Sequence, residues 1–290
     1  MILLTGSSGF VGSFLRDKFK NSFLTSLGDT KNSLRNGFEI NKFLYEKLNI
    51  KSAILLGGIT QFPLIKENPD LAFDVNVTKL KKTIDNLLDN QIHITFVSSE
   101  SVFDGVKGNY YEDEKTSPIF YYGYMKEIIE QHLISSKRNN LYSIIRITKV
   151  YTANLKYKSL ISEHLQRLGT SFPYPIVRDM YTNPIDIESV CNAIYKISSQ
   201  QLTGIYHLGG KDIVSRKDIV EKINQFLIIN DYKEEIIKAE YKSKRDIPNF
   251  YFLPFNTSLN CSRSLKKLDL EQPSIIDCLK NSISRHLNME

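Results

Sequence analysis

Apolar residues follow two patterns along the first half of the chain. Short apolar runs predict buried parallel strands, and longer segments with apolar residues three or four positions apart predict amphipathic helices. The strands are expected at the N-terminus, 22–29, 53–58 and 92–97, and the helices from about 10, 70 and 121. This alternation of strands and helices predicts an α/β fold with a doubly wound parallel sheet.

Three glycines follow the first strand at a spacing of three residues, in Thr5-Gly-Ser-Ser-Gly-Phe-Val-Gly12. In a Rossmann-type turn, Gly6 permits a tight turn, Gly9 lets the backbone approach a pyrophosphate, and Gly12 permits close packing of helix on sheet. The pyrophosphate lies at the helix N-terminus, where free N–H groups favour negative charge. Glycine-rich turns without ligands are common, but the flanking strand and helix supply the required context. We predict that NAD(H) or NADP(H) binds at Gly6, Ser8, Gly9, Phe10, Val11 and Gly12.

An acidic residue ends the second predicted strand. Asp29 lies 23 residues after Gly6, close to the offset at which a carboxylate accepts hydrogen bonds from the adenosine ribose. This position slightly favours NAD(H) over NADP(H). The neighbouring Lys31 and Arg35 point the other way, because either cation could bind the 2′-phosphate of NADP(H). Asp29 is explained nearly as well as a carboxylate that forms an ordinary turn.

Gly57 and Gly58 end the strand at 53–58. The carboxyl edge of an open α/β sheet is where its ligands bind, so both glycines are candidates for cofactor contact, with an ordinary loop as the alternative.

Asn76 interrupts the apolar face of the helix expected at 70–88. A buried asparagine needs hydrogen-bond partners, and we expect them in a loop on the neighbouring strand.

Hydroxyl groups and a carboxylate follow the strand at 92–97, with Ser99 among them. Tyr122 and Lys126 are four residues apart and share one face of the next helix. A lysine beside a phenol favours the phenolate and lowers its pKa from about 10 toward a value useful for proton transfer. Such pairs are commonplace on protein surfaces. The order of glycine turn, Ser99, Tyr122 and Lys126 is what indicates catalysis.

This order resembles the extended short-chain dehydrogenase/reductase superfamily, which carries TGxxGxxG, a catalytic Ser or Thr, and YxxxK. Within it, the chain is similar to the dTDP-4-dehydrorhamnose reductase family, with its pattern S-T-D-x-V-F-D-G … Y-x-E … S-P … Y-G-x-x-K. The matching segments are Ser98–Gly105, Tyr111-Glu112, Ser117-Pro118, Tyr122–Lys126 and, more loosely, Asn183-Pro184, 204–210 with Ser215, and 259–262. The resemblance is therefore nearly end to end.

The resemblance implies roles for three residues. Tyr122 would be the general acid that protonates the carbonyl oxygen of the substrate. Lys126 would lower the pKa of Tyr122 and hold the nicotinamide ribose, and Ser99, where the family usually has Thr, would polarise the carbonyl. The nicotinamide supplies the hydride, so the protein orients the reactants and stabilises the developing alkoxide.

Some positions depart from the family pattern. Glu100 replaces an Asp, and Leu253-Pro254 replaces an Arg-Pro whose cation is expected near the diphosphate of the substrate. Ser101 stands where nucleotide-sugar 4,6-dehydratases carry a catalytic Glu, which argues against a dehydratase. Candidates for substrate contact are Ser99, Glu100, Arg178, Tyr181 and Asn183. For Arg178, Tyr181 and Asn183, a hydrogen bond between the two domains is an equally good explanation of the polar side chain. Candidates to replace the missing cation are Lys242, Lys244, Arg245 and Arg178.

The resemblance also implies a division into two domains. Residues 1–155 are expected to form the NAD(P)-binding Rossmann domain, with 178–200 returning to it. Residues 156–177 and 201–290 are expected to form a smaller α/β substrate-binding lobe.

Composition excludes several classes of protein. With 41% hydrophobic and 24% charged residues among 290, the chain is expected to be globular, neither disordered nor a membrane protein. The net charge is +6, but the basic residues are interleaved with acidic ones and the chain has no nucleic-acid-binding motif. We therefore expect no nucleic-acid partner. The start lacks a secretory signal, which predicts a cytoplasmic protein. No metal site or disulfide framework is expected from the widely spaced Cys191, Cys261 and Cys278.

These observations predict an NAD(P)H-dependent reductase of a 4-keto-deoxysugar nucleotide, in polysaccharide or glycoconjugate precursor synthesis. One alternative is a nucleotide-sugar epimerase with the same catalytic residues. Another is a non-catalytic nucleotide-binding subunit, like the regulatory β-subunit of methionine adenosyltransferase. A third is reduction of a substrate without a nucleotide. A homodimer is left open.

Overall fold

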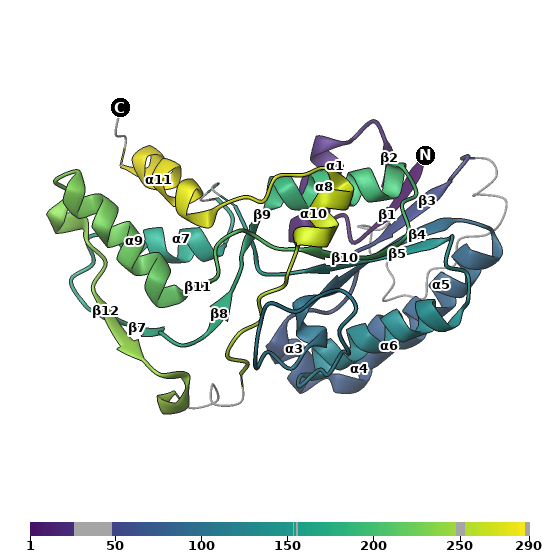
Figure 1. The fold of residues 1–290 in the computed structure, drawn as a ribbon, viewed down its shortest axis with the longest axis horizontal. Coiled ribbons are helices and arrows are strands. Elements are labelled where there is room, and N and C mark those ends of the chain that lie inside the picture. The colour runs from purple at the N-terminus through teal and green to yellow at the C-terminus, as the bar shows by residue number, and fades with distance from the viewer. Residues whose placement is uncertain (26–47, 153, 155, 248–252, 288–290) are drawn as a thin grey trace.

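A six-stranded parallel sheet forms the centre of the described structure (Figure 1). The structure is a computed structural model, and it describes residues 1–25, 48–152, 154, 156–247 and 253–287. The order is β10-β5-β4-β3-β1-β2, and every neighbouring pair is parallel. The strands are β1 (Ile2–Thr5), β2 (Phe23–Thr25), β3 (Ser52–Leu55), β4 (His93–Ser99), β5 (Tyr142–Ile147) and β10 (Gly204–Leu208). The predicted Rossmann-type α/β fold is confirmed.

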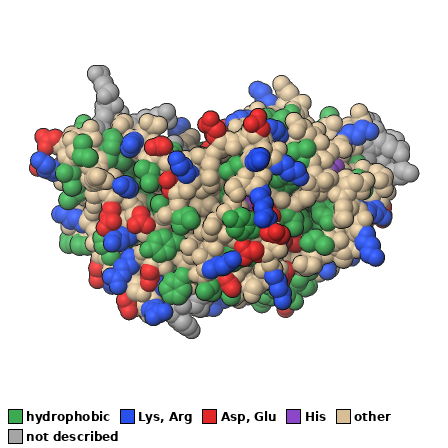
Figure 2. Space-filling view, in the orientation of Figure 1, with side chains coloured by type: hydrophobic (Ala, Val, Ile, Leu, Met, Phe, Trp, Pro, Cys, Tyr) green, Lys and Arg blue, Asp and Glu red, His purple; other side chains and the backbone are tan. Residues whose placement is uncertain are grey.

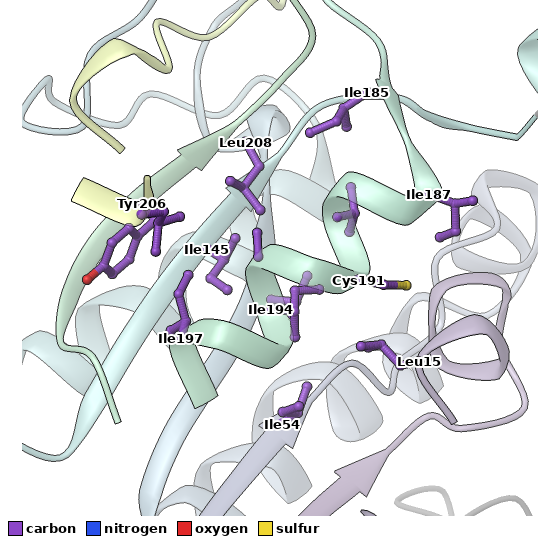
Figure 3. Close-up of a cluster of buried hydrophobic side chains, with 14 of the residues drawn as sticks. Leu15, Ile54, Ile145, Ile185, Ile187, Cys191, Ile194, Ile197, Tyr206 and Leu208 are labelled. Atoms are coloured by element: carbon purple, nitrogen blue, oxygen red, sulfur yellow. The ribbon is translucent and has the colours of Figure 1, made fainter. Parts of the chain in front are cut away.

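Helices cover both faces of this sheet because its strands are apolar on both sides. Along β1, Leu3 packs toward one face, whereas Ile2 and Leu4 pack toward the other. One face carries α5 (Leu80–Asp89) and α6 (Tyr121–Ser135). The other carries α1 (Phe10–Lys18), α8 (Ile187–Ser199) and α10 (Ser262–Leu268). Figure 3 shows buried side chains of α8 directed at those of β3, β5 and β10.

The helix expected at 70–88 forms with a local widening. It consists of α4 (Pro69–Phe73), a π-helical turn η2 (Asp74–Lys79) and α5, preceded by α3 (Phe62–Glu67). Single π turns inside helices often occur at functional sites. Here the turn contains Asn76, whose contacts are described below.

A second hydrophobic core lies at the other end of the molecule (Figure 1). Its helices are α7 (Leu160–Leu165), α9 (Arg216–Ile229) and α11 (Ile275–His286), and its parallel strands are β7 (Tyr174–Val177) and β12 (Ala239–Lys242). Two short pairs link the regions: β6 (Val150–Tyr151) with β9 (Ile185–Asp186), and β8 (Tyr181–Thr182) with β11 (Val214–Ser215). The short 3₁₀ turns are η3 (Glu100–Val102), η4 (Lys233–Glu235) and η5 (Lys244–Asp246).

One strand lies apart from its expected lobe. Residues 201–290 are expected in the smaller lobe, yet β10 pairs with β5 in the large sheet and α10 packs beside it. Tyr206 and Leu208 of β10 are fully buried against α8, so the apolar residues of the strand complete the larger core. The division into two domains otherwise stays a prediction.

Charged side chains of both signs are interspersed over the face shown in Figure 2. The net charge of +6 is therefore not gathered into one basic patch on that face. Within the described ranges, every helix is too short or too polar to cross a bilayer.

Candidate functional site

The glycine turn has the geometry expected for dinucleotide binding. Gly6 has φ +68°, and a side chain there would place its Cβ 2.8 Å from the backbone nitrogen of Gly57. A Cβ on Gly12 would lie 2.1 Å from the Gly6 carbonyl oxygen. Gly9 is the N-cap of α1 and donates its N–H to that same oxygen at 3.0 Å. Gly6 and Gly12 are thus needed by the fold, because nothing larger fits between β1, β3 and α1.

Gly9 has more room for a side chain than Gly6 and Gly12 have. A Cβ there would meet only the Gly6 carbonyl oxygen, at 3.3 Å, and φ at Gly9 is −75°. The fold therefore tolerates a small side chain at Gly9 better than at Gly6 or Gly12. A larger side chain would extend into the cavity that Gly9 lines.

The Thr5 hydroxyl fixes the adjacent strand ends. Its Oγ1 donates to the carbonyl oxygen of Ile54 at 3.3 Å and accepts the backbone N–H groups of Leu56 and Gly57 at 3.1 and 3.3 Å. Thr5 is fully buried, so this bond set holds the glycine turn against the end of β3.

Asn76 has the partners expected of it. Its side-chain oxygen accepts from the Ile59 N–H, and its amide nitrogen donates to the Ile59 carbonyl, both at 2.8 Å. Gly58 lies against the same side chain, with φ +153° and no room for a Cβ beside Asn76 Oδ1. The π turn therefore shapes the loop after β3, as expected from the buried asparagine.

One cavity of ≈ 1120 Å³ brings the predicted cofactor and catalytic residues together. It lies at the carboxyl edge of the sheet, where parallel α/β folds bind ligands. Its lining includes Gly6, Ser8, Gly9, Phe10, Val11, Gly12, Gly57, Gly58, Ser99, Glu100, Tyr122 and Lys126. Asp29, Lys31 and Arg35 lie outside the described residues.

Ser99 and Glu100 are hydrogen-bonded to each other at the end of β4. Ser99 Oγ donates to Glu100 Oε2 at 2.7 Å and lies 2.5 Å from Ser101 Oγ. The Ser101 N–H also donates to Ser99 Oγ, at 3.2 Å, because Ser99 is the N-cap of η3. The short 3₁₀ turn thus gathers two hydroxyls and one carboxylate within three consecutive residues.

Tyr122 and Lys126 lie on the inward face of the first turns of α6. Lys126 Nζ is 5.7 Å from the centre of the Tyr122 ring and 4.7 Å from that of Phe96. It donates to the Val97 carbonyl oxygen at 2.8 Å. Burial lowers the pKa of Lys126 to about 8, and the Glu130 carboxylate opposes that shift.

The expected lowering of the phenol pKa is wrong for this arrangement. Burial raises the pKa of Tyr122, and the negative charge of Glu100 raises it further. The Lys126 ammonium is directed at Val97, and it does not offset these two effects. At neutral pH Tyr122 is therefore a protonated phenol with a proton to give.

A second cavity of ≈ 280 Å³ adjoins the first and shares Glu100, Lys149 and Leu160 with it. Arg216 also lines it, as does Tyr181, one of the predicted substrate residues. Lys149 follows β5 at the carboxyl edge, and Arg216 begins α9. Neither cation was predicted from the sequence, although the position of Lys149 after a predicted strand is a signal of the kind used for Ser99.

Two predicted substrate residues lie elsewhere. Asn183 is 2% exposed. Its amide nitrogen donates to the Gly210 and Leu259 carbonyls at 3.1 and 3.0 Å, and its amide oxygen accepts the Leu259 N–H at 3.0 Å. This contradicts a substrate contact and supports the alternative of a structural hydrogen bond. Arg178 is exposed and lines neither cavity.

The other cations considered as replacements also lie outside both cavities. Lys244 is buried, donates to the Leu253 carbonyl and stacks on Phe255. Arg245 packs over the same ring, and Lys242 pairs with Glu240. Lys244 and Arg245 are thus engaged with Phe255, and Lys242 forms a surface ion pair within β12.

Known proteins resemble this chain in sequence or in fold. The beta subunit of methionine adenosyltransferase 2 from Xenopus laevis is 23% identical over 232 residues, covering 75% of this chain and 69% of that protein. A dTDP-4-dehydrorhamnose reductase from Yersinia enterocolitica has a TM-score of 0.84 at 19% identity, covering 98% of this chain and 99% of that chain. The dTDP-4-dehydrorhamnose reductase from Bacillus anthracis in complex with NADP has a TM-score of 0.79 at 19% identity, covering 98% of each chain.

The structural likenesses show the shared fold. The family model described as the RmlD substrate binding domain matches residues 1–287, nearly the full 290. This match confirms the resemblance predicted from the glycine turn and the motifs after β4. The chain belongs to the RmlD substrate binding domain family.

Proposed function

We propose that the protein is an NAD(P)H-dependent reductase of a 4-keto-deoxysugar nucleotide. The observation that carries this proposal is the single cavity that joins the glycine turn to Ser99, Tyr122 and Lys126. Family membership and the fold shared with dTDP-4-dehydrorhamnose reductases support it. A surface pair of Tyr and Lys would not share a cavity with a dinucleotide-type turn.

The residues present fit a nicotinamide dinucleotide. A Cβ at Gly9 would point to little besides the Gly6 carbonyl, so the backbone here is open to a pyrophosphate. Gly57, Gly58 and Lys126 line the same cavity, and Lys126 is the proposed partner of the nicotinamide ribose. The slight preference for NAD(H) rests on Asp29 alone and stays part of the proposal.

Tyr122 is the proposed general acid. When bound, the reduced nicotinamide supplies the hydride to the carbonyl carbon. Tyr122 gives its proton to the oxygen, and its raised pKa keeps that proton in place at neutral pH until the alkoxide develops. Ser99 polarises the same oxygen, and Lys126 adds positive charge beside the phenol.

Lys149 and Arg216 are the proposed partners of the diphosphate of the substrate. They line the smaller cavity, and the lobe cations favoured by sequence do not. Arg216 already pairs with Glu163 at 2.8 Å, which orients its guanidinium. An arginine fork beside a lysine is a common way to bind phosphate oxygens.

The test follows NAD(P)H absorbance during incubation with 4-keto nucleotide sugars. A reductase consumes one cofactor for each product formed, whereas an epimerase consumes none overall. Tyr122→Phe removes the acid and keeps the ring, so the chemical step should slow by roughly 10²–10⁴ with cofactor affinity near wild type. An equal rate in the variant would refute the role of Tyr122.

A binding subunit is the second candidate, because one relative is the beta subunit of methionine adenosyltransferase 2. The same assay separates the two functions. A binding subunit would bind the dinucleotide and form no product with any 4-keto sugar.

A homodimer and a cytoplasmic location complete the proposal. Light scattering coupled to size-exclusion chromatography would measure the mass in solution against the 33.4 kDa of one chain. Fractionation of the source cells would test the location.

A further inference from the structure

The hydroxyl of Ser99 has no free hydrogen in this arrangement. A serine hydroxyl has one hydrogen to donate and two lone pairs that accept. The hydrogen is directed to Glu100 Oε2 at 2.7 Å, and the Ser101 N–H donates to Ser99 Oγ at 3.2 Å. The Ser101 hydroxyl lies 2.5 Å from Ser99 Oγ, and it must be the donor of that pair because the Ser99 hydrogen is already used. While Glu100 is a carboxylate, Ser99 therefore cannot donate to a substrate oxygen.

Protonation of Glu100 reverses the bond. A neutral carboxyl group has an O–H of its own, which can donate to Ser99 Oγ. Ser99 then accepts from Glu100 and from the Ser101 N–H, which fill its two lone pairs, and the rotatable Ser101 hydroxyl turns its hydrogen elsewhere. The hydrogen of Ser99 is free to point into the cavity that it lines. The same proton removes the negative charge that raises the pKa of Tyr122.

The surroundings of Glu100 favour the neutral form. It lies where the two cavities meet, and burial raises its pKa, against the opposing effects of the Ser99 hydrogen bond and the Lys149 charge. The titratable and charged groups that line the cavities around it are Tyr122 and Lys126 of α6, Lys149 after β5, Lys158 and Glu163 near and on α7, Tyr181 of β8 and Arg216 of α9.

We propose that Glu100 is a positioning residue: its protonated carboxyl releases the Ser99 hydroxyl to donate to the substrate oxygen, and its carboxylate withholds it. This inference rests on the proposed reductase function. Glu100 keeps its proton throughout the reaction, in which the hydride comes from the cofactor and the transferred proton from Tyr122. The step thus needs no further reactant.

The proposal predicts a pH dependence with a definite sign. Below the pKa of Glu100 the carboxyl is neutral and Ser99 donates, so kcat/KM is high. As the pH rises through that pKa, kcat/KM falls. Glu100→Gln is neutral at every pH, and its amide N–H can donate to Ser99, so this decrease should be absent.

The first experiment compares pH profiles of kcat/KM for wild type, Glu100→Gln and the control Glu188→Gln. Glu188 is an exposed carboxylate of α8 outside both cavities. We expect wild type and the control to share a decrease that Glu100→Gln lacks, leaving the amide variant several-fold faster at alkaline pH. Parallel profiles, or a KM change without a pH change, would overturn the proposal.

The second experiment needs no turnover. Infrared spectra of the folded protein follow the carboxyl C=O band of Glu100, identified by its loss in Glu100→Gln. Because the Ser99 hydrogen bond stabilises the carboxylate, Ser99→Ala should raise the titration midpoint by roughly one pH unit. An unchanged midpoint would overturn the proposal. A protein that fails to reduce any 4-keto sugar, yet shows this shift, would refute the proposed function and leave the Glu100–Ser99 coupling established.

Discussion

Lys126→Met should stabilise the protein at neutral pH while weakening cofactor binding. Lys126 is charged at neutral pH although burial lowers its pKa from 10.5 to about 8. A shift of that size corresponds to about 3 kcal/mol of unfavourable free energy when the group is protonated in both the folded and unfolded chain. Met keeps the apolar stem and removes the charge.

The hydrogen bond to Val97 offsets part of this gain. Leaving the Val97 carbonyl without its partner costs about 1–3 kcal/mol. The net stabilisation at about pH 7 is therefore on the order of 1 kcal/mol. The dependence on pH is the larger signal.

The sign of that dependence follows from the lowered pKa. Between pH 8 and 10.5 the unfolded chain binds more protons at Lys126 than the folded protein, so wild-type stability rises with pH relative to the variant. From about pH 7 to about pH 10 the difference between the two proteins should change by about 2–3 kcal/mol, in favour of wild type.

Urea denaturation of both proteins at the two pH values measures this difference. Lys82→Met, at an exposed position of α5, controls for the change of residue type. The difference in free energy of unfolding between wild type and Lys126→Met should change with pH. A constant difference would refute the conclusion that burial of the Lys126 charge destabilises the folded protein. Dinucleotide titration of the same samples should show weaker binding by Lys126→Met.

Three other substitutions test separate parts of the structure. Gly9→Val should fold and lose dinucleotide affinity, because its side chain enters the large cavity; unchanged affinity by calorimetric titration would contradict the assignment. Asn76→Ala leaves both backbone groups of buried Ile59 without their partner and should destabilise the protein by roughly 2–4 kcal/mol in urea denaturation. Glu130→Met leaves the buried Arg146 guanidinium without its carboxylate, so thermal unfolding should report a loss of about 3–5 kcal/mol, whereas an unchanged Tm would show that the ion pair is dispensable.

The sequence by itself determined the features that depend on near neighbours in the chain. Apolar periodicity placed the parallel strands and their helices, since each side chain's face follows from its position along a strand or helix. The spacing of Gly6, Gly9 and Gly12 fixed the turn, because the room for a Cβ there is set within a few residues and by the adjacent strand. The family motifs fixed Ser99, Tyr122 and Lys126 as one set, and the large cavity brings them together.

Only the tertiary structure decided features that depend on distant segments. Asn183 bonds Gly210 and Leu259, and sequence cannot show whether its amide faces a cavity or a neighbouring loop. Lys149 and Arg216 are 67 positions apart and line one cavity through the packing of the lobe against the sheet. The direction of the Tyr122 pKa shift likewise depended on the fold, because burial and the Glu100 charge raise that pKa, and burial is a property of the folded whole.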